Sequence, residues 1–259
     1  LRDILDALQV AGKDSRVKGL VARIGNPGMG LAEIQELRDA IIAFRATGRT
    51  AIGYAETFGE FGPGNGAYYL ASAFDQIYLQ PSGDLGLTGL MAQASFFSGT
   101  LEKVGVRPRM ERRHEYKNAL NIFTESKFTP AHREAVTRII ESQFSQIVRG
   151  IAGGRQKTRE EIRALVDRGP FLASQALEEG LIDGLAYRDE VYEIAQGNAG
   201  HDVEPIGLLA FLRQAGFSND DGATIALIYG VGGVQRGRNG YSPALAGQTM
   251  GSDSVSAAF

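Results

Sequence analysis

The chain has 259 residues, a formal net charge of −3 at pH 7 from 27 Lys and Arg against 30 Asp and Glu, and no cysteine. Hydrophobic residues make up 43% and charged residues 22%, which is typical of a globular protein and excludes a disordered chain. The charge balance argues against nucleic-acid binding driven by overall charge. The lack of cysteine excludes disulfides, a cysteine nucleophile and cysteine-ligated metals.

The first 90 residues alternate between strand and helix patterns. Apolar runs that end at glycine or proline predict strands over 17–24, 50–55 and 76–79. Apolar residues at helical spacing predict helices that include 1–8, 31–42 and 67–73. Strands joined by helices form parallel sheets with right-handed crossovers. The sequence therefore predicts an α/β fold with a parallel sheet and flanking helices.

The next 100 residues are predicted to be mainly helical. Residues 107–112 are predicted to form a further strand, whereas Thr129 followed by Pro130 is typical of a helix start. A capping box begins at Thr158, and a short helix is predicted to begin at Ser174. No run of about 18 apolar residues is present, so the sequence predicts no membrane-spanning segment.

The composition changes near Asn198. A polar, turn-forming segment around 219–222 indicates a linker, and the apolar run 223–229 predicts a new strand. We therefore expect a first domain at 1–197, a linker region at 198–222 and the start of a second, similar unit at 223–259.

Motifs for metals and cofactors are weak. The three histidines, His114, His132 and His201, are scattered and are expected at the surface, so no metal site is predicted. The segment Gly62–Ala67 fits a loose dinucleotide fingerprint, but the preceding strand ends about seven residues too early, and no cofactor is expected. These glycines are interpreted as a lid, as the backbone lining of a cleft, or only as a tight turn. The turn 26–30 is interpreted as an anion or oxyanion site, or only as a helix start.

The stretch from Arg107 to Lys117 carries five basic and two acidic side chains, which is typical of a solvated face. Lys117 lies where a predicted strand gives way to a helix, a normal place for a functional residue in such a sheet. A lysine amine acts as a general base only when neutral, and an apolar surrounding favours the neutral form. Neighbouring apolar residues could supply that surrounding: Tyr116, Ala119, Leu120, Ile122 and Phe123.

Three segments together resemble the signal peptide peptidase A family, also called protease IV, in its long two-repeat form. They are Gly66–Ala73 with Asp75–Pro81, Tyr116–Ala119, and Gln175–Asp183. Their order and spacing fit the family from about residue 1 to 195.

The resemblance implies a crotonase/Clp-protease-like parallel sheet and a serine peptidase with a Ser–Lys dyad. Lys117 would be the general base, and the nucleophilic serine would lie in the second repeat, outside these residues. It also implies cleaved signal peptides and other apolar peptides as substrates, and a homo-oligomeric ring. A membrane anchor outside this chain would hold the catalytic part on the periplasmic side of the inner membrane.

Two other functions remain open. One is an acyl-CoA-binding enzyme of the crotonase type, which would use paired carboxylates and an oxyanion hole. The other is a non-catalytic repeat retained for assembly.

Overall fold

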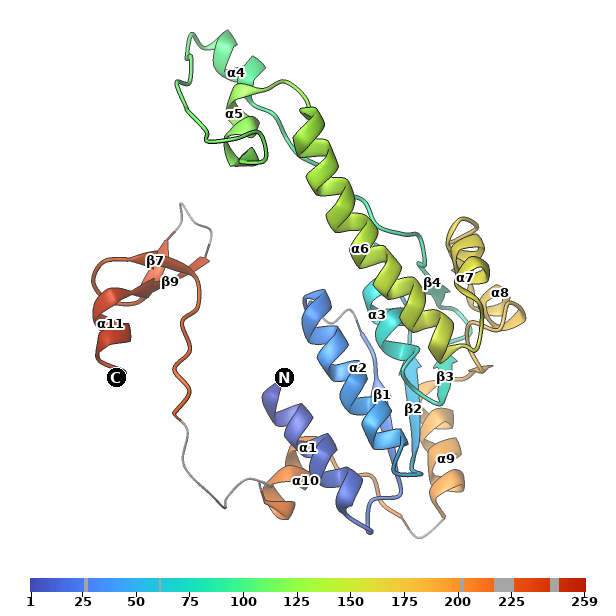
Figure 1. Cartoon of the computed structure of the whole chain (residues 1–259). Helices are drawn as coiled ribbons and strands as arrows, with labels where there is room; N and C mark the ends of the chain where they lie inside the picture. Colours follow the sequence, from blue (N-terminus) through green and yellow to red (C-terminus); the bar gives the residue numbers. More distant parts are fainter. Residues whose placement is uncertain (26–27, 61, 201–202, 217–225, 243–246) are drawn as a thin grey trace. The chain divides into compact units, whose positions relative to one another are not determined.

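The computed structural model of the chain describes residues 1–25, 28–60, 62–200, 203–216, 226–242 and 247–259 (Figure 1). It divides into two compact units, Leu1–Ser218 and Asn219–Phe259. The elements of the first unit, in chain order, are α1 (Arg2–Lys13), β1 (Gly19–Arg23), α2 (Leu31–Arg45), β2 (Thr50–Ala55), α3 (Asn65–Ala71), β3 (Gln76–Leu79), β4 (Asp84–Leu85), α4 (Ser98–Lys103), the 3-10 turn η1 (Asn118–Leu120), α5 (Asn121–Thr124), α6 (Pro130–Gly154), α7 (Arg159–Val166), β5 (Phe171–Leu172), α8 (Ala173–Glu178), β6 (Gly184–Leu185), α9 (Arg188–Ala199) and α10 (Leu208–Ala215).

A parallel sheet forms the centre of the first unit. Its strand order is β1-β2-β3-β6, and each neighbouring pair is parallel. The register pairs Val21 with Ile52, and Tyr54 with Tyr78. The three strands predicted in the first 90 residues are all present, so the predicted α/β class with a parallel sheet is confirmed.

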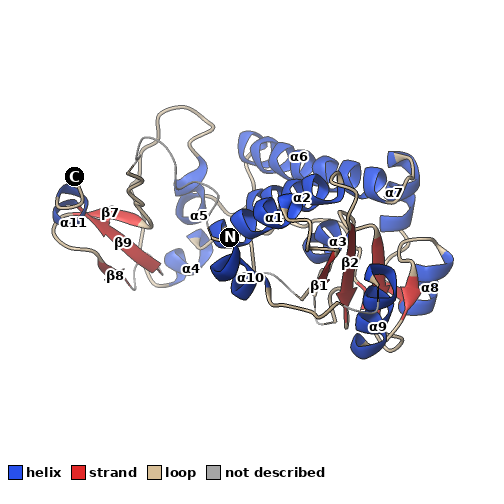
Figure 2. Cartoon of the chain, turned by 90° about the horizontal axis from the view of Figure 1, so that it is seen from below, coloured by secondary structure: helices blue, strands red, loops and turns tan. Residues whose placement is uncertain are grey.

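Helices cover both faces of this sheet (Figure 2). Alternate residues of β2 point to opposite faces, as a strand requires. Ala51 and Ala55 belong to the larger core, which also contains buried residues of α1, α2, α3, α6 and α7. Ile52 and Tyr54 face the other way and pack with Val191 of α9. Burial on both faces explains why β2 has no alternating polar residues after Thr50.

The long helix α6 approaches α3 at backbone distance. A Cβ atom at Gly154 would lie 1.8 Å from the carbonyl oxygen of Ser72, so only glycine fits. Arg38 of α2 is buried at the same junction, where its guanidinium lies 4.0 Å from the ring centre of Tyr69. It donates to Ser72 Oγ at 2.7 Å and to the carbonyl oxygen of Gly150 at 3.2 Å. Arg38 therefore joins α2, α3 and α6.

The other end of α6 carries the segment that contains α4, η1 and α5 (Figure 1). The strand predicted over 107–112 is wrong: these residues lie in no strand and are almost all exposed. A strand needs a neighbour to pair with, and the described strands pair with other partners.

The second unit contains β7 (Gly233–Gln235), β8 (Gly240–Ser242), β9 (Gly247–Gly251) and α11 (Ser252–Ser256). Strand β9 is central, parallel to β7 and antiparallel to β8. Of the strand predicted over 223–229, the structure describes only 226–229, which lie in no strand or helix, and the rest lies outside the described residues. None of the helices in the described ranges is long and apolar enough to cross a membrane.

Candidate active site

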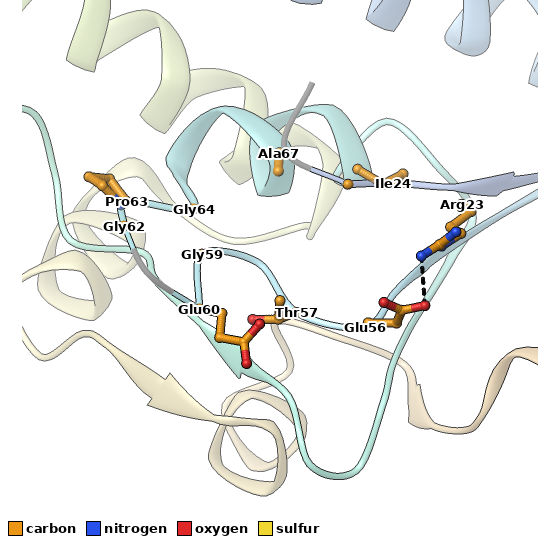
Figure 3. A pocket seen from close by; sticks show the side chains of 11 residues that line it. Arg23, Ile24, Glu56, Thr57, Gly59, Glu60, Gly62, Pro63, Gly64 and Ala67 are labelled. Atoms are coloured by element: carbon orange, nitrogen blue, oxygen red, sulfur yellow. Dashed lines mark hydrogen bonds and ion pairs between the residues drawn. The ribbon is translucent and has the colours of Figure 1, made fainter. Parts of the chain in front are cut away.

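A cavity of about 520 Å³ opens at the carboxyl ends of β1 and β2. This is the edge at which parallel α/β sheets bind their ligands, because the loops there diverge. The cavity is lined by Arg23, Ile24, Gly25, Glu56, Thr57, Gly59, Glu60, Gly62, Pro63, Gly64 and Ala67 (Figure 3).

Charged side chains stand at the rim of this cavity. The guanidinium of Arg23 lies 2.8 Å from Glu56 Oε1, and the two side chains are 56% and 49% exposed (Figure 3). An ion pair this accessible contributes at most about 1 kcal/mol to stability. Thr57 is not a free hydroxyl, because its Oγ1 donates to the carboxylate of Asp84.

The glycine loop of the cavity is joined by backbone hydrogen bonds to the segment 84–89, which begins with β4. The amide of Gly64 donates to the carbonyl oxygen of Gly86 at 2.8 Å, and the amide of Gly86 donates to the carbonyl oxygen of Phe58 at 2.7 Å. A Cβ at Gly64 would lie 1.6 Å from the Phe58 oxygen, so this close approach requires glycine. Of the interpretations open from the sequence, a backbone lining of a cavity fits this geometry.

Asn65, the first residue of α3, holds the same segment from the other side. Its Oδ1 accepts hydrogen bonds from the amides of Thr88 and Gly89, at 3.1 and 3.2 Å. Its Nδ2 donates to the Gly89 carbonyl oxygen at 2.7 Å. Buried Asn65 therefore fixes the path of the chain behind the cavity.

Lys117 lies outside this cavity lining, in the segment at the far end of α6. It directly precedes η1, and its amide donates to the carbonyl oxygen of His114 at 3.4 Å. In this chain Lys117 and Ala119 are exposed and Tyr116 is 54% exposed, whereas Leu120, Ile122 and Phe123 are half-buried, so the apolar neighbours of Lys117 do not enclose it by themselves. The segment lies at the end of α6 away from the sheet (Figure 1), and most of residues 102–119 are exposed. The catalytic role of Lys117 is a separate matter and stays a prediction.

Tyr116 connects the segment 112–121 that carries Lys117, here called the lysine segment, to α6. Its hydroxyl donates to Glu134 Oε2 at 2.8 Å. This hydrogen bond to a carboxylate raises the pKa of Tyr116 above its ordinary value. The contact is exposed and fixes the tyrosine ring rather than the lysine amine.

The expectation of surface histidines is wrong for His132, which is 9% exposed. The rings of Phe128 and Phe96 pack against it, with centres 4.7 and 6.1 Å away. His114 is exposed as expected, and His201 lies outside the described residues. In the part of the chain that the structure describes, no cluster of three or more His, Cys, Asp or Glu could hold a metal ion.

Sequence reasoning missed the charged lining of the cavity. Arg23 is the penultimate residue of the predicted strand 17–24, and Glu56 and Glu60 follow the predicted strand 50–55 closely. That position at the carboxyl ends of the strands was the available signal. Of the turn 26–30, residues 26 and 27 lie outside the described residues. Met29 packs against the larger core, and Gly30 is the N-cap of α2.

Several curated proteins are similar in sequence to this chain, two of which illustrate the match. One is the chloroplastic serine protease SPPA of Arabidopsis thaliana, 28% identical over 190 residues, which are 73% of this chain and 27% of that protein. The other is Protease 4 of Salmonella typhi, 26% identical over 251 residues, or 92% of this chain and 40% of that protein. The chain thus spans between about a quarter and two fifths of the length of these relatives. Among solved structures, a peptidase from Plasmodium falciparum aligns with a TM-score of 0.39 at 14% identity, over 72% of this chain and 88% of that one.

The profile of Peptidase family S49 matches residues 60–202. This match spans more than half of the chain and includes the glycine loop, α3 and the lysine segment. The chain belongs to peptidase family S49.

Proposed function

We propose that this chain is part of a serine endopeptidase in which Lys117 is the general base of a Ser–Lys dyad. The observation that carries the proposal is the S49 match over 60–202, which contains Lys117 and its flanking residues. In this mechanism the neutral amine of Lys117 takes the proton of a serine hydroxyl as the serine attacks the peptide carbonyl. The resulting ammonium then returns a proton to the leaving amine.

The nucleophilic serine is proposed to come from residues outside this chain. The hydroxyl of Thr57, in the cavity lining, is engaged by Asp84. The chain also corresponds to 40% of the length of Protease 4 of Salmonella typhi, which leaves room for a second repeat. We propose residues 1–197 as the lysine-bearing repeat, 198–222 as the linker region and 223–259 as the start of the serine-bearing repeat.

The exposure of Lys117 bears on how such a site would be completed. A lysine amine surrounded by water is favoured in its charged form, in which it cannot accept a proton. The proposed dyad therefore needs a second surface that brings the serine and excludes water from Lys117. A serine-bearing repeat or a neighbouring copy in a homo-oligomeric ring would supply this surface.

The proposed substrates are cleaved signal peptides and other apolar peptides in extended form. An extended peptide adds to an exposed strand edge through main-chain hydrogen bonds, and its side chains enter apolar pockets. We further propose a membrane anchor outside this chain, with the catalytic part facing the periplasm.

The experiment is to substitute Lys117 in the full-length protein and measure cleavage of a fluorogenic apolar peptide. Lys117→Ala is expected to lower kcat by about 100-fold or more, the usual effect of losing a general base. Lys117→Arg is expected to fail as well, because a guanidinium stays protonated. Lys103→Ala, at an exposed lysine of α4, is the matched control and should cleave at the wild-type rate. Wild-type cleavage by either Lys117 variant would refute the proposal.

A second candidate is a non-catalytic repeat retained for assembly, which the exposure of Lys117 favours. This function predicts full peptidase activity in Lys117→Ala. It also predicts loss of the oligomer, measured by analytical ultracentrifugation, when this repeat is deleted from the full-length protein.

A further inference from the structure

Four residues after Lys117, the side chain of Asn121 is fully buried in a part of the chain that is otherwise largely exposed. Its Oδ1 accepts a hydrogen bond from the guanidinium of Arg112. Its Nδ2 lies 3.4 Å from both Thr129 Oγ1 and His132 Nδ1. The side-chain amide of Asn121, at one end of the segment 112–121, thus contacts Arg112 at the other end and the start of α6.

The donors and acceptors around this amide determine its orientation. A guanidinium only donates, so the atom of Asn121 that faces Arg112 is the carbonyl oxygen. The NH₂ group therefore faces His132, and a hydrogen bond between them requires an unprotonated Nδ1.

His132 is held firmly in this position. Its ring packs edge-on against Phe96 and Phe128, and its backbone amide donates to Thr129 Oγ1 at 3.2 Å. Thr129 caps α6, and residues 147–152 near the other end of this helix include much of its buried contact with the core. A single rigid helix therefore extends from the core to the contact with Asn121.

The lysine segment has few other anchors. The amide of Lys117 donates to the His114 carbonyl oxygen at the long distance of 3.4 Å, and the contact of Tyr116 with Glu134 is exposed. A catalytic group displaced by about 1 Å loses about 100-fold in rate. A catalytic Lys117 therefore has to be held in place, and the buried contacts of Asn121 are able to do this.

We propose that Asn121 and His132 are positioning residues, which hold the segment 112–121 so that the amine of Lys117 is presented in one orientation. The inference rests on the proposed function of Lys117. Neither residue touches substrate: Asn121 acts on the lysine through the chain between them, and His132 acts through Asn121.

The test uses the full-length protein with the fluorogenic apolar peptide. His132→Phe keeps the aromatic packing and removes the Nδ1 acceptor, whereas His132→Asn restores an acceptor oxygen close to the same place. We expect kcat to fall about 10-fold or more in His132→Phe and in Asn121→Leu, with KM within about 2-fold of wild type. His132→Asn should recover most of kcat. Hydrogen exchange should rise in 112–121 and stay unchanged in the sheet.

His114→Asn is the matched control, because it removes an exposed histidine from the same segment. The backbone of His114 has a φ of 67°, a conformation that asparagine tolerates. This variant should keep the wild-type kcat. Wild-type kcat in His132→Phe and Asn121→Leu, with Lys117→Ala inactive, would overturn the positioning role and leave the proposed function standing. Equal losses in His132→Phe and His132→Asn would also overturn it, since they would indicate a general packing defect. Full activity in Lys117→Ala would refute the proposed function itself, and the positioning role with it.

Discussion

Replacing Gly154 by alanine tests whether α6 is seated on α3 by backbone contact. An alanine Cβ at this position would lie 1.8 Å from the Ser72 carbonyl oxygen and 3.2 Å from the Ser72 Cβ. The preceding residue, Gly153, is a matched control, because a Cβ there would meet no described atom within 4 Å. Both glycines lie in the last turn of α6, so the pair separates helix propensity from packing.

The two substitutions are expected to change the free energy of unfolding in opposite directions. Alanine is favoured over glycine in a helix by up to about 1 kcal/mol, so Gly153→Ala should raise the free energy of unfolding by about 0.5 kcal/mol. Gly154→Ala gains the same, but its Cβ forces α6 and the backbone of α3 apart by more than an ångström. Overpacking of this kind costs about 1–3 kcal/mol. The two variants should therefore differ by about 1–3 kcal/mol, with Gly154→Ala the less stable.

Thermal unfolding followed by far-UV circular dichroism measures this difference. For a unit of this size, 1 kcal/mol shifts the melting temperature by about 2–4 °C, so the variants should melt about 2–12 °C apart. If Gly154→Ala melts at or above the temperature of Gly153→Ala, α6 does not contact α3 in the way described.

Two further substitutions test the supports of the cavity and of α7. Asn65→Ala removes the hydrogen bonds to Thr88 and Gly89 and should lower the free energy of unfolding by about 2–3 kcal/mol in urea titrations. An unchanged urea midpoint would contradict this role. Thr158→Ala removes the capping hydrogen bond to the Glu161 amide and should cost about 1 kcal/mol. Hydrogen bonds from the backbone and side chain of Thr158 hold the pKa of Glu161 below its ordinary value. The Glu161 carboxylate therefore stabilises the fold at neutral pH, and this stabilisation is lost as the pH falls through the folded-state pKa. In Thr158→Ala the pKa of Glu161 should rise only part of the way to its ordinary value, because the backbone N–H of residue 158 still donates to the carboxylate. An NMR titration of Glu161 that shows no rise would refute the role of the Thr158 hydroxyl.

Local patterns predicted most of the sheet and its helices. The runs 50–55 and 76–79 correspond to β2 and β3 residue for residue, and the Thr129-Pro130 signal marks the start of α6. These predictions succeed because hydrophobic periodicity and helix-start signals are carried by residues close in sequence. The prediction for 107–112 failed for the complementary reason, since strand formation there depended on a partner that the described fold does not provide.

The site was predicted in part. The glycine loop was recognised, whereas the rim residues Arg23 and Glu56 were not. They lie 33 positions apart in the sequence and meet only because β1 and β2 pair in parallel. His132 was expected at the surface, since nothing in its local sequence shows that Phe96 folds back over it from 36 positions away.

The sequence by itself determined the α/β class, the main strands and helices, and the resemblance that the S49 match over 60–202 supports. Only the tertiary structure decided that a cavity opens beside charged rim residues, that Lys117 is exposed in this chain, and that Asn121 and His132 are buried near it. Periodicity and capping are local properties of a chain. Burial and hydrogen-bond partnership depend on which distant segments pack together, and that is set by the fold as a whole.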